Sequence, residues 1–299
     1  MTAQSVAARS SELAWLDEPR AVLGEGPVWN PQTKRLFWVD CDQKKLFDLD
    51  PRTNHVTTTQ LPSAPGSYAF RHKGGMIMAY RNKLVLLDEA GAVERLVETP
   101  LVDFATERFN DGACDCLGRF WVGTMDPKMA RATGSLFCVE PDLAIRRVQA
   151  DITVSNGLAF SPDNRTLYHT DSRIGKIYAY DFDLQAGAIS HRRLHIDFKD
   201  VGGRPDGCTI DSDGHLWVAV IETGAIVRFD PAGREVGRIA LPITRPTSTM
   251  FGGEDLRTLY ITSMKHALSA EELEQQPLAG CLLSVRTEQH GMPEPFFAG

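Results

Sequence analysis

The sequence predicts an all-β protein, a single six-bladed β-propeller of four-stranded antiparallel blades spanning residues 1–299. Three observations support this fold class. Short strand-like segments recur along the whole chain, their spacing stays close to one repeat length, and helical periodicity is nearly absent. The repeats account for nearly all of the chain, so a long linker between two domains has no place in it.

The clearest repeat is a strand that begins after a turn and carries an aromatic or second apolar residue near its start. Its five strongest copies are RLFWVD (35–40), GRFWVGT (118–124), RTLYHTD (165–171), GHLWVAV (214–220) and RTLYITS (257–263). GGMIMAY (74–80) is a weaker sixth copy. A second short strand with an acid or turn residue after it follows each copy. We expect the aromatic residues of this series to pack between blades.

A polar residue opens the strand that precedes each copy. The six openings are Glu25, Ser67, Asn110, Asn156, Asp206 and Ser248, at successive steps of 42, 43, 46, 50 and 42 residues. A period of about 40–50 residues with four short strands per unit is typical of a propeller blade. Because the first strand of each blade lies nearest the channel, we expect the six openings to surround one end of the axis.

This ring of openings predicts a site for one divalent cation. Carboxylate and carboxamide oxygens suit Ca²⁺ first, with Zn²⁺, Mn²⁺, Mg²⁺ and Fe²⁺ as other candidates. Without a cation the carboxylates of Glu25 and Asp206 would repel each other. For each residue taken alone the alternative is a turn cap at the channel mouth, since Asp206 lies between Pro205 and Gly207.

The sixth unit lacks a fourth strand after Glu288. We expect LAWLDEP (13–19), which precedes the first unit, to complete this blade and close the ring. Such closure removes the exposed sheet edges that otherwise invite aggregation. PFFAG (295–299) is the competing candidate for the same place.

Composition narrows the class of protein. A formal net charge of −7 and the lack of a long basic run argue against nucleic-acid binding. No apolar stretch approaches the roughly 18 residues of a membrane span, and the N-terminal residues lack the apolar stretch of a signal peptide. We therefore expect a cytoplasmic monomer or small homo-oligomer without a membrane partner. The six cysteines adjoin apolar strand-like runs, and we expect reduced core residues.

Longer motifs resemble one known family. They are LGEGPVWNP (23–31), RFNDGACD (108–115), GRFWVGTMD (118–126), SNGLAFSPD (155–163), PDGCTIDSDGHLWVA (205–219), FGGEDLRTLYIT (251–262) and QPLAGCLLSV (276–285). In this order, over nearly the whole chain, they are similar to the regucalcin/gluconolactonase family, also called senescence marker proteins. The resemblance implies a six-bladed propeller that hydrolyses sugar lactones with one divalent cation in its channel.

The resemblance also implies roles for individual residues. The metal ligands would be Glu25, Asn156 and Asp206, and Asp206 would also be the catalytic acid/base. Arg108 and Asn110 match the family's substrate-contacting pair.

One position departs from the family pattern. Members such as the vertebrate protein carry a substrate-contacting glutamate shortly after the GTM motif, and here that position is Lys128 in GTMDPKMARATG. We treat Lys128 as a candidate substrate-binding residue. Together with Arg131 it would attract a lactone that carries its own carboxylate, or else both side chains simply extend into water.

The predicted activity is hydrolysis of a small-molecule sugar lactone to the open-chain acid, with Asp206 moving the proton. A phosphotriesterase-type hydrolase on the same metal propeller and a non-enzymatic calcium-binding propeller are the alternatives. We also expect loops 126–133 and 265–280 to overhang the cation. The second should carry a short helix as a partial lid, because Ser269 and Glu272 form a capping-box pattern.

Overall fold

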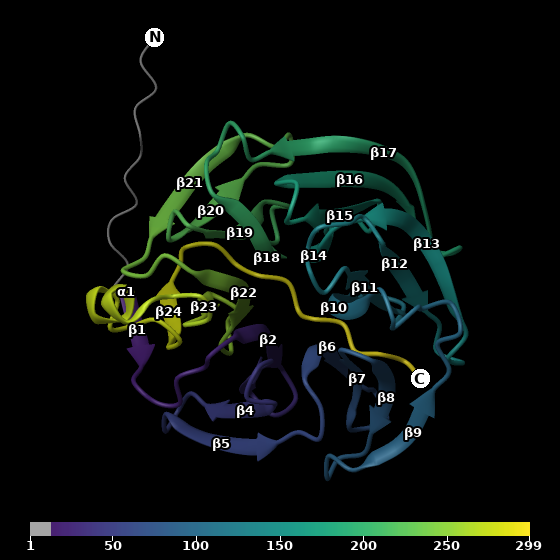
Figure 1. Ribbon diagram of the computed structural model, residues 1–299, viewed down its shortest axis with the longest axis horizontal. Helices are drawn as coiled ribbons and strands as arrows, with labels where there is room; N and C mark the ends of the chain where they lie inside the picture. The colour runs from purple at the N-terminus through teal and green to yellow at the C-terminus, as the bar shows by residue number, and fades with distance from the viewer. Residues whose placement is uncertain (1–12) are drawn as a thin grey trace.

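The computed structural model describes residues 13–299, which form a ring of six four-stranded antiparallel sheets (Figure 1). Blade one comprises β2 (Gly24–Asn30), β3 (Arg35–Asp40), β4 (Lys45–Asp50) and β5 (His55–Gln60). Blade two comprises β6 (Pro65–Phe70), β7 (Met76–Tyr80), β8 (Lys83–Leu87) and β9 (Val93–Val97). Blade three comprises β10 (Arg108–Cys114), β11 (Phe120–Met125), β12 (Gly134–Val139) and β13 (Ile145–Ile152). The prediction of a six-bladed propeller is confirmed.

The remaining blades have the same order of strands from the channel outward. Blade four comprises β14 (Ser155–Phe160), β15 (Thr166–Asp171), β16 (Lys176–Asp183) and β17 (Ala188–Asp197). Blade five comprises β18 (Arg204–Ile210), β19 (Leu216–Ile221), β20 (Ala225–Phe229) and β21 (Glu235–Ala240). Blade six comprises β22 (Pro246–Gly252), β23 (Thr258–Ser263), β24 (Leu282–Arg286) and β1 (Leu13–Leu16).

The sixth blade combines both ends of the described chain. Its outer strand is β1, which runs antiparallel to β24 with Leu13 opposite Val285 and Trp15 opposite Leu283. The competing segment 295–299 takes another path. It belongs to a C-terminal segment that runs across the middle of the ring (Figure 1).

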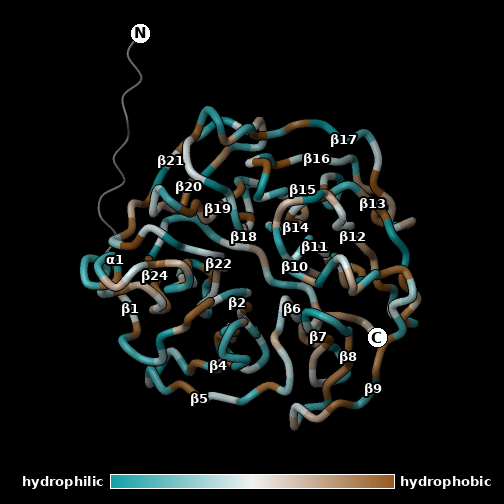
Figure 2. Tube along the Cα trace, viewed as in Figure 1, coloured by the Kyte–Doolittle hydropathy of each residue, from teal (hydrophilic) through white to brown (hydrophobic). Residues whose placement is uncertain are grey.

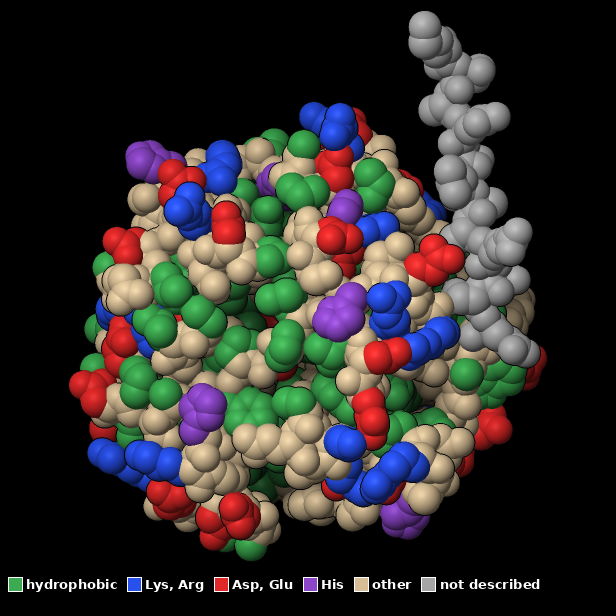
Figure 3. Space-filling view, turned by 180° about the vertical axis from the view of Figure 1, so that it is seen from behind, with side chains coloured by type: hydrophobic (Ala, Val, Ile, Leu, Met, Phe, Trp, Pro, Cys, Tyr) green, Lys and Arg blue, Asp and Glu red, His purple; other side chains and the backbone are tan. Residues whose placement is uncertain are grey.

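The core lies between neighbouring blades. Strands such as β11, β12 and β19 are buried along their whole length, so their sheets offer apolar faces to the blades on both sides, and hydrophobic stretches appear brown in Figure 2. The aromatic series predicted as inter-blade core is buried throughout: Phe37, Trp121, Tyr168, Trp217 and Tyr260. On the face seen in Figure 3, charged side chains of both signs lie mostly around the rim, with hydrophobic ones toward the middle.

The cysteines follow the expectation with one exception. All six are free thiols, four of them are buried, and Cys208 is partly buried. Cys116 is exposed, because it lies in the turn between β10 and β11 rather than on a strand.

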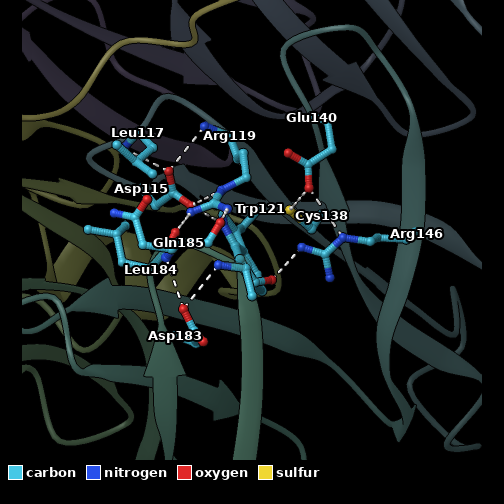
Figure 4. A network of polar contacts seen from close by, with 12 residues as sticks. Asp115, Leu117, Arg119, Trp121, Cys138, Glu140, Arg146, Asp183, Leu184 and Gln185 are labelled. Atoms are coloured by element: carbon cyan, nitrogen blue, oxygen red, sulfur yellow. Dashed lines mark hydrogen bonds and ion pairs between the residues drawn. The ribbon is translucent and has the colours of Figure 1, made fainter.

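A buried aspartate organises the strand-one to strand-two hairpin in blades three and five. The carboxylate of Asp115 accepts hydrogen bonds from the backbone amides of Leu117 and Arg119, from Arg119 Nε and from Trp121 Nε1 (Figure 4). Asp211 holds Trp217 Nε1 in the same way in blade five. The indole of each tryptophan can therefore enter the inter-blade core with its N–H satisfied.

The expected short helix is present. It is α1 (Ala270–Gln275), and both hydrogen bonds of the capping box between Ser269 and Glu272 form. It buries none of its residues, and it lies beside β1 and β24 at the outer edge of the ring (Figure 1). The expectation of a partial lid over the channel is therefore wrong for α1. No helix among residues 13–299 is long and apolar enough to cross a membrane.

Candidate active site

The predicted ring of polar openings lies at the start of the six innermost strands, and every one of these strands is irregular there. The ladder to the second strand shifts register beside or across Glu25, Ser67, Asn110, Asn156, Asp206 and Ser248. A β-bulge bends the strand and re-aims a side chain. Repeated around the ring, it allows polar side chains to turn toward the axis where regular pleating would bury them between blades.

Close packing of the backbone accompanies the bulges. Gly157 has a φ of +45°, and a Cβ at this position would lie 2.7 Å from the backbone oxygen of Asp206. A side chain at residue 157 would therefore push β14 and β18 apart. Glycine after Asn156 lets the two strands bring Asn156 and Asp206 together.

Three of the six ring residues form the centre of the site. Asn156 Nδ2 donates a hydrogen bond to Asp206 Oδ1, and both side chains are buried. Burial raises the pKa of Asp206 to about 8. The pKa of Glu25 is raised well above its usual range by burial and then by the negative charges of Asp206 and Asp111.

This donor set fits a hard divalent cation. The negative charges of Asp206 and Asp111 make Glu25 costly to ionise, and a cation between the carboxylates removes that cost. The amide of Asn156 lies against the carboxylate of Asp206, so turning it over would present its oxygen to the same ion. Glu25, Asn156 and Asp206 are therefore brought together as the sequence predicts.

A further carboxylate, Asp111, belongs to the site and was missed by sequence reasoning. Its Oδ2 accepts from the backbone amide of Gly157 at 2.9 Å and its Oδ1 from that of Gly112 at 2.8 Å. Burial raises its pKa to about 6. The available signal was an acid directly after Asn110 in a Gly-containing bulge, but that pattern also describes an ordinary turn.

Arg108 and Asn110 form a connected pair. Arg108 Nη1 donates to Asn110 Oδ1 at 2.9 Å, and Asn110 Nδ2 donates to the backbone oxygen of Ser155 at 2.9 Å. Asn110 thus ties the guanidinium of blade three to the strand that carries Asn156. Its carbonyl oxygen retains one lone pair for a substrate hydroxyl.

Lys128 lies at the same end of the propeller but outside this network. Arg108 pairs with Met125 in the β10–β11 ladder, so the loop after Met125 begins beside Arg108. The carboxylate of Asp126 accepts from the backbone amides of Lys128, Ala130 and Arg131 and so shapes the loop. The side chain of Lys128 is exposed. The structure does not bring it into contact with Glu25, Asn156 or Asp206.

A second group of possible ligands lies at the other end of the strands. Carboxylate or imidazole atoms of Asp211, Asp213 and His215 lie within 4.8 Å of one another. Both oxygens of Asp211 already accept hydrogen bonds, and Arg228 Nη2 lies 3.0 Å from one of them. A positive partner and filled acceptor positions make this group a poor cation site.

A cavity of about 160 Å³ separates the ring from the C-terminal segment. It is lined by Gly26, Asp111 and Cys208 near the ring and by Met292 and Glu294 of the C-terminal segment. The C-terminal segment therefore crosses the channel on the side away from the strand openings, and we expect substrate to enter at the opposite end, the mouth beside Arg108.

Comparison with known proteins places this geometry in a family. The model of the SMP-30/gluconolactonase/LRE-like region matches residues 23–265. A 6-deoxy-6-sulfogluconolactonase of Pseudomonas putida is 43% identical over 281 residues, which cover 93% of this chain and 96% of that one. Regucalcin of Xenopus laevis is 35% identical over 270 residues, 88% and 90% of the two chains.

A solved structure agrees with the sequence comparisons. The calcium-binding protein regucalcin from Agrobacterium tumefaciens superposes with a TM-score of 0.90 at 27% identity, covering 95% of this chain and 97% of that one. Fold, order of motifs and similarity over nearly the full length all agree. The chain therefore belongs to the SMP-30/gluconolactonase/LRE-like family, a family of sugar lactonases.

Proposed function

We propose that the protein hydrolyses a sugar lactone with the help of one divalent cation held by Glu25, Asn156 and Asp206. The observation that carries the proposal is the convergence of these three side chains, with Asn156 and Asp206 buried and Glu25 partly buried, at one end of the channel. A family relationship to lactonases supports the reaction class. Oxygen ligands and the similarity to a calcium-binding regucalcin support Ca²⁺ as the first candidate.

Hydrolysis joins the oxygen of a water to the acyl carbon and breaks the bond from that carbon to the ring oxygen. Bound at this site, the cation would supply Lewis-acid stabilisation of negative charge on the carbonyl oxygen. Asp206 takes a proton from the attacking water and returns it to the departing ring oxygen. The product is the open-chain hydroxy acid.

The remaining residues bind and orient the substrate. Arg108 can only donate hydrogen bonds, whereas the free lone pair of Asn110 Oδ1 can accept one from a sugar hydroxyl. The carboxylate of Asp111 holds the backbone amide of Gly157, which follows Asn156, and so helps to orient Asn156. The cavity toward Glu294 remains separated from the mouth by the ring residues.

We further propose that the lactone carries an anionic substituent. The Pseudomonas putida relative is named for a lactone with a sulfonate. Around the mouth of this chain lie Arg108 and, in the neighbouring loop, the exposed Lys128 and Arg131. A basic mouth above an acidic cation site favours a substrate with a negative group distant from its carbonyl.

The first test separates proton transfer from metal binding. Asp206→Asn keeps an oxygen ligand but removes the base, so kcat should fall by about 10²–10⁴-fold while the bound metal is retained. Asp206→Ala should lose the metal as well. Asn110→Ala is the matched control, because it removes a binding group of the same ring, and it should mainly raise KM.

Metal content by elemental analysis and lactone hydrolysis by acid release would be measured on the same preparations. Treatment with a chelator should abolish the activity of the wild type, and added Ca²⁺ should restore it. If Asp206→Asn retained most of its activity, the acid/base assignment would be wrong. If chelation left the activity intact, the cation would have no part in the reaction.

A further inference from the structure

An arginine of blade two, Arg81, lies at the mouth beside Arg108. It occupies the turn between β7 and β8, and its backbone oxygen accepts a hydrogen bond of 3.0 Å from the amide of Phe109. Its own amide donates to the oxygen of Ala64 at 2.8 Å. The turn is therefore anchored on both sides, and Arg81 is held against the start of β10, where Arg108 is found.

The guanidinium of Arg81 is only partly satisfied. Its Nη2 donates to Asp42 Oδ1 at 2.9 Å, and the other oxygen of Asp42 lies 2.9 Å from His266 Nδ1. The Nε of Arg81 is buried and has no partner among residues 13–299. A buried donor without an acceptor is costly, so a group that supplies an acceptor there would be stabilised.

Arg108, unlike Arg81 with its Asp42 partner, is a cation without an ion pair among the described residues. Its Nη1 donates to the oxygens of Asn110 and Phe109, which are both neutral acceptors. Burial and then the positive charge of Arg81 lower the pKa of Arg108 to about 10. Burial and then the charge of Glu25 raise the pKa of the Cys41 thiol, whereas the positive charges of Arg108 and Arg81 lower it. Because the Arg81 turn is bonded to Phe109, the residue after Arg108, the two guanidiniums lie near each other, and Arg108 also lies close to Glu25.

We propose that Arg81 and Arg108 form a subsite for an oxyanion group carried by the substrate. Asp42 compensates the charge of Arg81 through Nη2 only, so an anion placed between the two guanidiniums would fill donors that remain free and reduce their mutual repulsion. A sulfonate, carboxylate or phosphate offers several oxygens to their planar forks. This inference rests on the proposed function, and it names the part of the site that would select an anionic lactone.

The competing explanation is that Arg81 only joins blades one and two through Asp42. In that case its loss would reduce stability and would weaken every ligand to the same extent. A subsite makes a different prediction, because only ligands with the extra anionic group would be affected. The ratio of affinities for two ligands that differ in that group decides between the two explanations.

The experiment measures binding of two open-chain acids by calorimetry: 6-deoxy-6-sulfogluconate and gluconate. Wild type should prefer the sulfonated acid. Arg81→Gln should reduce that preference by about tenfold, as expected for loss of one charge-assisted hydrogen bond, with gluconate affinity changed by less than about twofold. Arg81→Lys, which keeps the charge but not the fork, should retain part of the preference.

The matched control is Arg95→Gln, which removes a positive charge from exposed β9 of the same blade and should leave the ratio unchanged. Lys128→Gln in the same assay tests the role that the sequence suggests for Lys128. An unchanged ratio in Arg81→Gln, or no preference in wild type, would overturn the proposal. Hydrolysis is measured in parallel: if no lactone is cleaved the proposed function fails, while the binding ratio still decides the subsite.

Discussion

At the scale of single residues, the site depends on a buried pair that does no chemistry. Ser155 Oγ and His169 Nε2 lie 2.8 Å apart, and neither side chain reaches solvent. Burial lowers the pKa of His169 to about 3, so the ring is neutral at ordinary pH. A Cβ at Gly123 would lie 1.8 Å from Ser155 Oγ, so the hydroxyl occupies space that only glycine leaves open. The pair thereby locks the strand that presents Asn156.

Ser155→Ala should destabilise the fold by about 1–3 kcal/mol, because it leaves His169 Nε2 buried without a partner. Denaturant unfolding would measure the change. Ser212→Ala, at an exposed position, is the control and should stay within about 0.5 kcal/mol of wild type. A loss in Ser155→Ala no larger than in this control would show that the pair contributes little to stability.

At the scale of elements, the innermost strands have two distinct ends. The end with the bulges collects the polar ring, and the other end carries the hairpin turns organised by Asp115 and Asp211. In blade three, Asp115 is fully buried and its partner Arg119 is nearly so, with Nε to Oδ2 at 2.6 Å. Arg119 also reaches the backbone oxygen of Leu184 in blade four, so one aspartate indirectly couples two blades (Figure 4).

Asp115→Asn should cost about 3–5 kcal/mol, because it leaves the buried guanidinium of Arg119 without its counter-charge. The control is Asp181→Asn, which breaks an exposed pair with Arg193 and should cost no more than about 1 kcal/mol. The denaturant concentrations at the unfolding midpoints of both variants would show the difference in stability, provided that the free energy of unfolding depends on denaturant concentration with the same slope in both. Similar losses in the two variants would contradict the assigned role of Asp115.

At the scale of the whole molecule, the C-terminal segment ties blades together across the channel. Gly291 contacts Leu256 of blade six, Phe297 pairs with Phe70 of blade two, and Ala298 bonds to Gly118 of blade three. Arg71 Nε donates to the backbone oxygen of Gly299. The segment thus closes the channel opposite the mouth and places Glu294 against the cavity.

Glu294 should make stability depend on pH. Burial and then the charge of Asp111 raise its pKa from 4.5 to about 7. Between these values the unfolded state loses its proton first, so stability should fall as pH rises from 4.5 to 7, by at most about 3 kcal/mol. Glu294→Gln should remove this part of the dependence, which unfolding at pH 5 and pH 8 would measure. An equal pH dependence in wild type and variant would refute the assignment.

Much of the architecture could be read from the sequence. The repeat of strand, turn and polar opening predicts six blades, and its register places Glu25, Asn110, Asn156 and Asp206 at one end of the axis. These features follow from local patterns, because strand periodicity and turn residues act over a few neighbours and recur in every blade. The helix at Ala270–Gln275 was predictable for the same reason, since its capping box is local.

Other features were decided only by tertiary structure. Two backbone hydrogen bonds, from Phe109 to the Arg81 turn and from Phe297 to Phe70, join segments that are far apart in the chain. No periodic pattern in the sequence predicts either of them. The position of α1 at the rim rather than over the mouth depends on how the sixth blade closes around β1. The sequence determines the charge of each side chain and its spacing along the chain. The packing of neighbouring blades determines which charged side chains lie next to each other. That packing sets two arginines beside one acidic ring.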